Sequence, residues 1–298
     1  MQKSSLLPTH CDWCPLACGA NRLEGNSGLC GADDEIYVAR HSLHHWEEPP
    51  ISGKSGSGTI FFSNCSMKCI YCQNHKISFE GAGCIVSIEE LIDMCQDLQN
   101  QGAMNINFVT GTHYRSQIIS AVRQANLDIP VVWNTSGYET QASVSALSSI
   151  VDVWLTDFKY SDNDLCKKLS MNKIDNYRDI ALEAISTMLD FCDTRKFDIF
   201  NEEARMTKGV IVRHLLLPGH LDNSKECLRL LYDNFGNEIK YSIMNQYTPC
   251  NKLEYDELNS SATEEEYEAL LNYADELGID DYYWQQGDTA KTSFIPDF

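Results

Sequence analysis

The 298-residue sequence has no apolar run near the ~20 residues that a membrane span needs, and residues 1–8 contain no apolar stretch long enough for a signal peptide. Basic residues are also scarce, with 23 Lys and Arg against 43 Asp and Glu and a formal net charge of −20. Because phosphate binding needs clustered basic side chains, this balance excludes a nucleic-acid-binding protein. We therefore expect a cytoplasmic protein that binds neither membrane nor nucleic acid.

Cysteine, in contrast, is abundant, with 13 residues. In a chain of this length without a signal peptide, many cysteines indicate reduced metal ligands rather than a disulfide scaffold. Seven of the 13 fall in the first 72 residues, in two clusters. The other six occur singly and are expected to be small buried side chains: Cys84, Cys95, Cys166, Cys192, Cys227 and Cys250.

The second cluster has the spacing C-x3-C-x2-C, formed by Cys65, Cys69 and Cys72 directly after the apolar segment 59–62. Each iron of a cubane 4Fe–4S cluster takes one thiolate, so three cysteines leave the fourth iron open to a small molecule. The alternatives are a zinc knot or a plain electron-transfer cluster. Zinc usually takes four ligands in paired C-x2-C units, which this loop does not supply.

With Tyr71 just before its last cysteine, this loop resembles that of the radical S-adenosylmethionine superfamily. The resemblance implies a 4Fe–4S cluster on the three cysteines and S-adenosylmethionine chelated by the open iron. It further implies that Tyr71 lies beside the adenine. One electron would then cleave the cofactor to a 5′-deoxyadenosyl radical.

The chain divides at about residue 55. Residues 1–54 are irregular and rich in Cys, Gly, Pro and His, and we interpret them as a metal-binding extension; residues 55–298 form the core with a carboxyl-terminal helix and tail. Alternating strand-like and helix-like segments predict an α/β fold with a parallel sheet. The resemblance implies a partial (β/α)6 barrel. The expected strands are 58–63, 104–110, 130–134, 151–157, 209–217 and 239–245.

Polar residues follow several of these strands, and the carboxyl ends of parallel strands carry the chemistry of such folds. The second strand ends in Thr110-Gly111-Thr112, where superfamily members often carry a carboxylate for the cofactor's amine. We assign that role here to hydroxyls or backbone carbonyls, with Thr110 as a candidate. Thr135, after the third strand, is a second candidate contact, although it could equally cap the next helix.

Two cations follow later strands. Asp157-Phe158-Lys159 resembles the Asp-Leu-Lys element of glycyl-radical activating enzymes, in which the lysine contacts the cofactor. Arg213 lies in an apolar run, so its charge needs a partner, either a cofactor carboxylate or an acidic neighbour. After the sixth strand, Gln246 or Tyr247 either contacts the adenine or only lines the pocket.

The strings that include Cys72-Gln73-Asn74 and the segments 134–138 and 213–219 are similar to radical S-adenosylmethionine proteins of the pyruvate formate-lyase activating enzyme-like branch. The similarity extends from about residue 11 to the tail 294–298. It implies a glycyl-radical protein as the substrate and a flavodoxin- or ferredoxin-type electron donor. The alternatives are a radical enzyme acting on a peptide or small molecule, and a non-catalytic iron–sulfur or zinc protein.

The first cluster of cysteines comprises Cys11, Cys14, Cys18 and Cys30, called here the amino-terminal cysteine group. Four thiolates would saturate either a second 4Fe–4S cluster or a structural zinc ion. A segment so short and poor in core residues needs such a staple to become ordered.

A further group, His41, His44 and His45 with Glu47 and Glu48, could bind metal if His41 and His45 shared a helix face. A solvated loop is the simpler interpretation, and no metal is assigned there.

Overall fold

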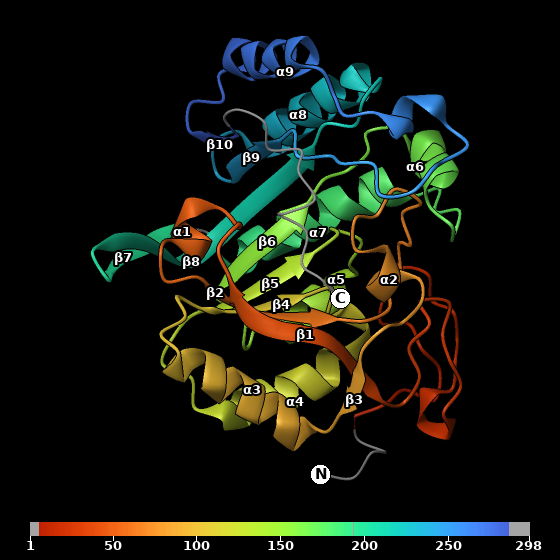
Figure 1. Cartoon of the computed structure of the whole chain (residues 1–298), viewed down its shortest axis with the longest axis vertical. Coiled ribbons are helices and arrows are strands. Elements are labelled where there is room, and N and C mark those ends of the chain that lie inside the picture. Colours follow the sequence, from red (N-terminus) through yellow and green to blue (C-terminus); the bar gives the residue numbers. More distant parts are fainter. Residues whose placement is uncertain (1–5, 193, 286–298) are drawn as a thin grey trace.

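The computed structural model describes residues 6–192 and 194–285. Its strands form one sheet with the order β10-β9-β8-β6-β5-β4-β2-β1-β3, and β7 pairs with β8 alone (Figure 1). The strands are β1 (Ile36–His44), β2 (Ser57–Phe62), β3 (Cys84–Val86), β4 (Ile106–Val109), β5 (Val131–Thr135), β6 (Val153–Asp157), β7 (Lys196–Phe200), β8 (Glu203–Leu215), β9 (Lys240–Met244) and β10 (Tyr282–Trp284).

The six strands expected from the sequence correspond to β2, β4, β5, β6, β8 and β9. These six are neighbours in chain order, and every pair among them is parallel. The predicted α/β fold with a mostly parallel sheet is therefore confirmed. The sequence did not predict β1, which pairs antiparallel with β2 and lies within residues 1–54, where irregular chain was expected.

Helices follow the parallel strands and pack side by side in the order α3, α4, α5, α7, α8 and α9. Both predicted capping boxes are present, with Ser87 opening α3 and Thr263 opening α9. None of the helices in the described chain is long and apolar enough to cross a membrane. The helices are α1 (Pro49–Ser52), α2 (His75–Ser78), α3 (Ile88–Asn100), α4 (Arg115–Ala125), α5 (Gln141–Leu147), α6 (Asn163–Leu169), α7 (Tyr177–Phe191), α8 (Leu221–Phe235) and α9 (Glu264–Leu277).

On the sheet face that these helices leave uncovered, the side chains are apolar along the strands and become polar at the carboxyl ends of the strands. Val153 and Leu155 of β6 pack with Ile51 of α1 in one buried apolar cluster. Side chains two residues apart on a strand share a face, so Asp157 points to the same side, beyond the apolar cluster. Val132 and Asn134 of β5, and Ile211 and Arg213 of β8, repeat this pattern. The sheet thus carries a polar floor at its carboxyl edge.

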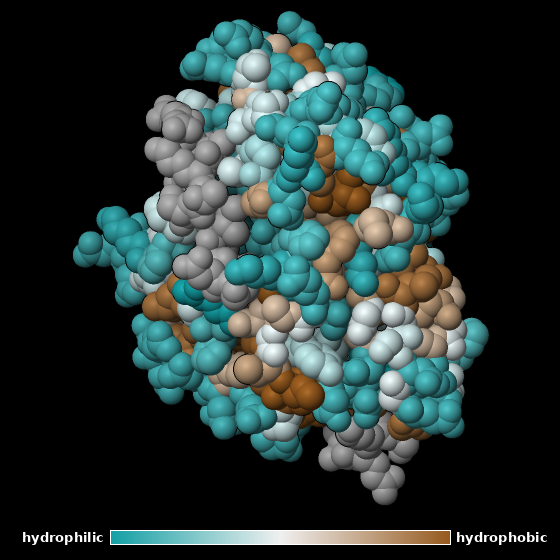
Figure 2. Space-filling view, turned by 45° about the vertical axis from the view of Figure 1, so that its right-hand side comes forward, coloured by the Kyte–Doolittle hydropathy of each residue, from teal (hydrophilic) through white to brown (hydrophobic). Residues whose placement is uncertain are grey.

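Residues 6–35 contain no strand or α-helix, only the short 3-10 helix η2 (Arg22–Glu24). This segment, red in Figure 1, lies beside α2 (Figure 1). The backbone N–H of Cys65 donates to the Cys30 carbonyl at 3.3 Å, which joins the two cysteine clusters directly. The face of the molecule in Figure 2 is mostly hydrophilic, with small separate hydrophobic areas, as the strong net charge leads one to expect.

Candidate functional site

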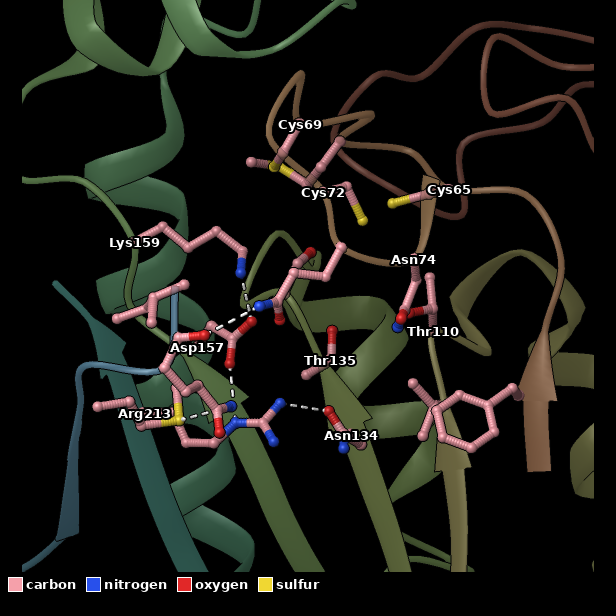
Figure 3. A pocket seen from close by; sticks show the side chains of 18 of the residues that line it. Cys65, Cys69, Cys72, Asn74, Thr110, Asn134, Thr135, Asp157, Lys159 and Arg213 are labelled. Atoms are coloured by element: carbon pink, nitrogen blue, oxygen red, sulfur yellow. Dashed lines mark hydrogen bonds and ion pairs between the residues drawn. The ribbon is translucent and has the colours of Figure 1, made fainter. Parts of the chain in front are cut away.

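A cavity of about 260 Å³ opens at the carboxyl edge of the parallel strands. The side chains predicted for the cluster and the cofactor all line it, although they come from loops and strands far apart in the sequence (Figure 3). They are Cys65, Cys69, Tyr71, Cys72, Thr110, Thr135, Lys159 and Arg213. The structure therefore gathers the predicted residues into a single site.

The cysteine loop, residues 63–74, joins β2 to α2. Asn64 (φ 76°) and Lys68 (φ 47°) adopt left-handed backbone conformations, which non-glycine residues rarely do, and they turn the loop sharply. The loop is also tied to the chain after α6, because the N–H of Met171 donates to the Lys68 carbonyl at 2.9 Å. These constraints hold the cysteines at one end of the cavity (Figure 3).

Two thiols of this loop, those of Cys65 and Cys69, are poor acids in the protein alone. Burial raises the pKa of Cys65 to about 11 and that of Cys69 to about 12, against the opposing charge of Lys159. Thiols in such a setting are protonated until a metal displaces the proton. Three soft sulfur donors around one cavity are the ligand type that iron–sulfur clusters take.

The spacing of these donors bears on which metal group fits. Across the described residues, no three Cys, His, Asp or Glu side chains converge closely enough to hold a single metal ion. A cubane cluster places each thiolate on a different iron, so its ligands surround a larger volume. The three cysteines fit a cluster better than a lone zinc ion.

The floor of the cavity is a network of charged side chains centred on Arg213. Its Nε donates to Asp157 Oδ1 at 2.9 Å, its Nη1 to Glu47 Oε2 at 3.0 Å and its Nη2 to Asn134 Oδ1 at 2.5 Å. Lys159 Nζ donates to the second oxygen of Asp157 at 2.5 Å. Two cations thus face two carboxylates in a largely buried site (Figure 3).

The pKa values of the floor follow from this pairing. Burial raises the pKa of Asp157, but Lys159 and Arg213 outweigh it and hold the pKa below its ordinary value. Burial likewise lowers the pKa of Lys159, and Asp157 reverses this, so that the pKa is raised. For Glu47, burial prevails over the Arg213 charge and the pKa is raised. Asp157 and Lys159 are therefore both charged at neutral pH.

The two cations predicted to contact the cofactor, Arg213 and Lys159, differ in how many of their hydrogen-bond donors are already used. Each of the three nitrogens of Arg213 already donates to a protein group. Lys159 has three donor hydrogens, and in the described part of the chain its Nζ forms one hydrogen bond, to Asp157. An acidic neighbour is thus the partner of Arg213, one of the two partners that the sequence left open. Lys159 keeps donors that can reach a ligand.

Glu139, which the sequence analysis missed, supports the wall behind Thr135. The carboxyl group is buried, and its Oε1 accepts hydrogen bonds from Thr135 at 2.7 Å and from Thr112 at 2.5 Å. Thr112 is thereby turned away from the cavity, whereas Thr110 lines it in a left-handed conformation (φ 58°). Strained conformations of this kind cluster at functional sites.

Tyr71 is fixed beside the cavity by other aromatic residues. Its hydroxyl accepts a hydrogen bond from Tyr160 at 2.8 Å, and its ring meets that of Tyr247 edge-on, with centroids 6.1 Å apart. Tyr247 and Gln246 both line the cavity, and Gln246 is tied to the cysteine loop because Gln73 Nε2 donates to its carbonyl at 2.9 Å. The tip after β9 therefore closes the side of the cavity next to Tyr71.

The histidine group does not gather into a metal site. His41 and His44 lie on strand β1 rather than on a helix, and His41 is exposed. His44 and Glu47 line the cavity instead, and Glu47 reaches the floor of the site through Arg213. Sequence reasoning missed that role because it depends on β1 folding back along β2.

The amino-terminal cysteine group lies outside the cavity lining. A β-carbon on Gly28 would come within 3.2 Å of Cys18 Sγ and 3.4 Å of Cys30 Sγ, so these two thiols border the same gap. The N–H of Ala32 donates to Cys30 Sγ at 3.4 Å, a contact that stabilises a thiolate. Cys11 and Cys30 are buried, and Cys14 and Cys18 are half-buried.

Comparison with known proteins bears on this site. A family model described as the Radical SAM superfamily matches residues 59–231, which include the cysteine loop and the strands up to β8. A curated relative, "Uncharacterized protein MJ0674" of Methanocaldococcus jannaschii, is 32% identical over 289 residues. That match covers 92% of this chain and 77% of the relative.

Solved structures also resemble the chain. A radical SAM methyltransferase from Sphaerobacter thermophilus has a TM-score of 0.50 at 13% identity, covering 85% of this chain and 78% of that one. Streptococcus suis SuiB, in a crystal structure with S-adenosylmethionine, has a TM-score of 0.49 at 11% identity, covering 74% and 48%. At such identities the likeness to the methyltransferase concerns the fold alone.

Proposed function

Because this chain belongs to the radical SAM superfamily, we propose that it is an iron–sulfur enzyme that cleaves S-adenosylmethionine reductively and activates a glycyl-radical protein. The observation that carries the proposal is the shared cavity, which three cysteines enter from one end and Lys159 from the side. When bound, the cluster and the cofactor supply the electron and the hydrogen-abstracting radical.

The residues of the chain divide this work by position. Cys65, Cys69 and Cys72 would each hold one iron of the cluster, which would leave one iron without a protein thiolate. Lys159 donates to the carboxylate of the cofactor, and the Arg213 network holds Lys159 and its partner Asp157 in place.

The wall residues orient the rest of the cofactor. Thr110 and Thr135 line the cavity where an amine or a ribose can be received, with the Thr135 hydroxyl held by Glu139, and Tyr71 provides an aromatic edge for the adenine.

The proposal includes the finer description of the fold. The six parallel strands and their outer helices form a partial (β/α)6 barrel from residue 55 onward, and residues 1–54 are a Cys-rich extension that binds its own metal. The tail 294–298, which the family resemblance includes, lies outside the described residues. A flavodoxin- or ferredoxin-type protein in the cytoplasm supplies the electron.

A second candidate is a radical enzyme that acts on a peptide or small molecule. It is favoured by His44, Trp46 and Glu47, which line the cavity from the β1–α1 connection and could recognise a small polar substrate. Such a substrate would make a partner protein unnecessary.

The first experiment tests cofactor cleavage. Anaerobically purified protein, reduced with dithionite, is expected to form 5′-deoxyadenosine from S-adenosylmethionine, and Cys69→Ala is expected to abolish it. Cys84→Ala serves as the control and should retain cleavage, because Cys84, like Cys250, is exposed rather than buried as the sequence led us to expect. Robust cleavage by Cys69→Ala would refute the cluster assignment.

The second experiment tests the target. A glycyl-radical protein from the same organism, labelled with α-deuterated glycine, should transfer deuterium to 5′-deoxyadenosine and acquire a glycyl radical visible by EPR. Cleavage without deuterium transfer or a glycyl signal would favour the small-molecule candidate.

A further inference from the structure

Arg22 is a completely buried cation without a carboxylate partner in the described chain. Its Nε donates to the Asp33 carbonyl at 2.7 Å, and its Nη1 donates to the His113 carbonyl. Its guanidinium also lies over two aromatic rings, 5.1 Å from the Trp13 centroid and 5.8 Å from the Tyr114 centroid. The carbonyls accept its hydrogen bonds and the rings stack on it, but neither carries a formal negative charge to balance it.

A buried charge is costly unless a charge of opposite sign lies near it. Trp13, on which Arg22 stacks, lies between Cys11 and Cys14 in the chain. The backbone also brings Arg22 close to this group, because the N–H groups of Cys11 and Arg22 both donate to the Ala20 carbonyl, each at 3.1 Å. The missing counter-charge therefore lies where ionised amino-terminal cysteines would supply it.

We propose that the amino-terminal cysteine group binds a tetrathiolate metal centre and that Arg22 is the buried counter-ion of this centre. No three Cys, His, Asp or Glu side chains of the described residues converge closely enough for a single metal ion, so the centre is a closed cubane cluster, which is anionic with four thiolates. The gap left by Gly28 between Cys18 and Cys30, and the Ala32 N–H that donates to Cys30 Sγ, are features of a cradle built for charged sulfur.

Arg115 is a second cation at this site, but it is a weaker candidate for the counter-ion. It lies 4.9 Å from the Trp13 centroid and donates to the Trp13 carbonyl at 3.1 Å. Asp12 and Glu139 also act on its charge, so it already has acidic neighbours. Neither arginine has an ion-pair partner in the part of the chain that the structure describes, but Arg22 is completely buried and Arg115 only half-buried, which makes Arg22 the sharper test.

Arg22 also connects the proposed centre to the candidate active site. The His113 carbonyl that accepts from Arg22 belongs to the residue whose Nε2 contacts the Ser63 carbonyl at 2.8 Å, at the start of the cysteine loop. With the bond from Cys65 N–H to the Cys30 carbonyl, this gives the loop two connections to the amino-terminal segment. Arg22 is therefore a positioning residue for the centre and does not touch the cavity.

The test uses the full chain with Cys65, Cys69 and Cys72 all changed to Ala, so that the remaining metal belongs to the amino-terminal centre. This background should hold about four irons per chain, because a cubane cluster contains four. About one zinc per chain in place of iron would overturn the cluster assignment. S-adenosylmethionine is absent, so the outcome is independent of the proposed function. A folded, metal-free background protein would overturn the proposal.

Arg22→Gln is then introduced into this background, and the release of metal to excess chelator is followed. Mutation of a residue that supports metal ligands typically lowers metal affinity by about 10–100-fold, and we expect Arg22→Gln to lower it by that much. Arg22→Lys should recover part of it because the charge is kept. Arg229→Gln, which removes a surface charge paired with Glu226 and Asp233, should leave metal release unchanged.

Circular dichroism of each variant separates a charge effect from misfolding. Arg22→Gln that is folded and releases metal at the rate of the background protein would overturn the counter-ion assignment. If the triple background variant does not fold, the wild-type chain is compared with Cys11→Ala/Cys14→Ala. The proposal then requires the wild type to hold about four more irons than the double variant, and equal iron contents would contradict it.

Discussion

Arg213 and Asp157 occupy paired positions on the neighbouring parallel strands β8 and β6, and Arg213 Nε donates to Asp157 Oδ1 at 2.9 Å. The pairing follows from register, since each residue follows an inward-facing apolar residue by two positions. The floor of the cavity is thus charge-balanced by the protein itself before any ligand binds.

Arg213→Met should destabilise the protein. The change leaves Glu47 without its cation and Asp157 with Lys159 alone, and breaking a buried pair by removing one partner costs about 3–5 kcal/mol. Urea unfolding measures the loss. Adding Glu47→Gln should restore part of the stability, because the remaining buried charge is removed. Wild-type stability of Arg213→Met would show that the network contributes nothing to the fold.

Lys159→Met should instead act on binding. The loss of a charge-assisted hydrogen bond to the cofactor is worth about 1.5–3 kcal/mol, or roughly ten- to a hundredfold in affinity. Equilibrium binding of S-adenosylmethionine to reconstituted protein measures this, and iron analysis checks that the cluster is still assembled. Unchanged affinity with an intact cluster would reduce Lys159 to a partner of Asp157.

Gly137→Ala should disturb the tip of β5. Gly137 has a left-handed backbone (φ 79°), and an added β-carbon would collide with the Asp157 carbonyl oxygen. The matched control is Gly102→Ala, where φ is 86° but no atom lies within 4 Å of the new carbon. The control should cost about 1–2 kcal/mol from the backbone alone, and Gly137→Ala about 1–3 kcal/mol more. If both variants lose the same unfolding free energy in urea, the chain after β5 accommodates the added β-carbon without cost.

His214 should make stability depend on pH. Its Nδ1 donates to the Phe158 carbonyl at 2.7 Å, and burial lowers the pKa to about 4. Above the ordinary value of 6.5 both the folded and the unfolded states are neutral. As the pH falls from there toward 4, only the unfolded state gains the proton, so stability is lost, by about 1.4 kcal/mol at about pH 5.5.

The variant His214→Asn keeps a donor near the Phe158 carbonyl but cannot titrate in this range. Its unfolding free energy should therefore fall less between about pH 7.5 and 5.5 than that of the wild type. His41→Asn, a change at an exposed histidine of β1, is the control. A pH dependence in His214→Asn equal to that of the wild type would contradict the assignment.

Much of this fold could be predicted from local patterns. The apolar segments that became β4, β5 and β6 are short and bounded by polar tips, and parallel order brings those tips to one edge. Their position after apolar strands, together with the family resemblance, therefore identified Thr135, Lys159 and Arg213 as candidates.

What the sequence could not predict depends on contacts between distant segments. Strand β1 carries Arg40, His41 and Ser42, which give no apolar alternation, so neither the strand nor the placement of Glu47 was foreseen. Glu139 was missed because its role depends on accepting hydrogen bonds from hydroxyls on two different strand tips. The bond between Cys65 and Cys30 likewise exists only once the amino-terminal segment has packed on the loop.

The central claim is that Cys65, Cys69 and Cys72 hold a cluster whose open iron binds S-adenosylmethionine. EPR of the anaerobically reduced protein, before and after the cofactor is added, tests it most directly. The spectrum of the wild type should change on addition, and no cofactor-dependent change should occur in the variant with all three cysteines replaced by Ala. A wild-type cluster whose spectrum is the same with and without S-adenosylmethionine would contradict it.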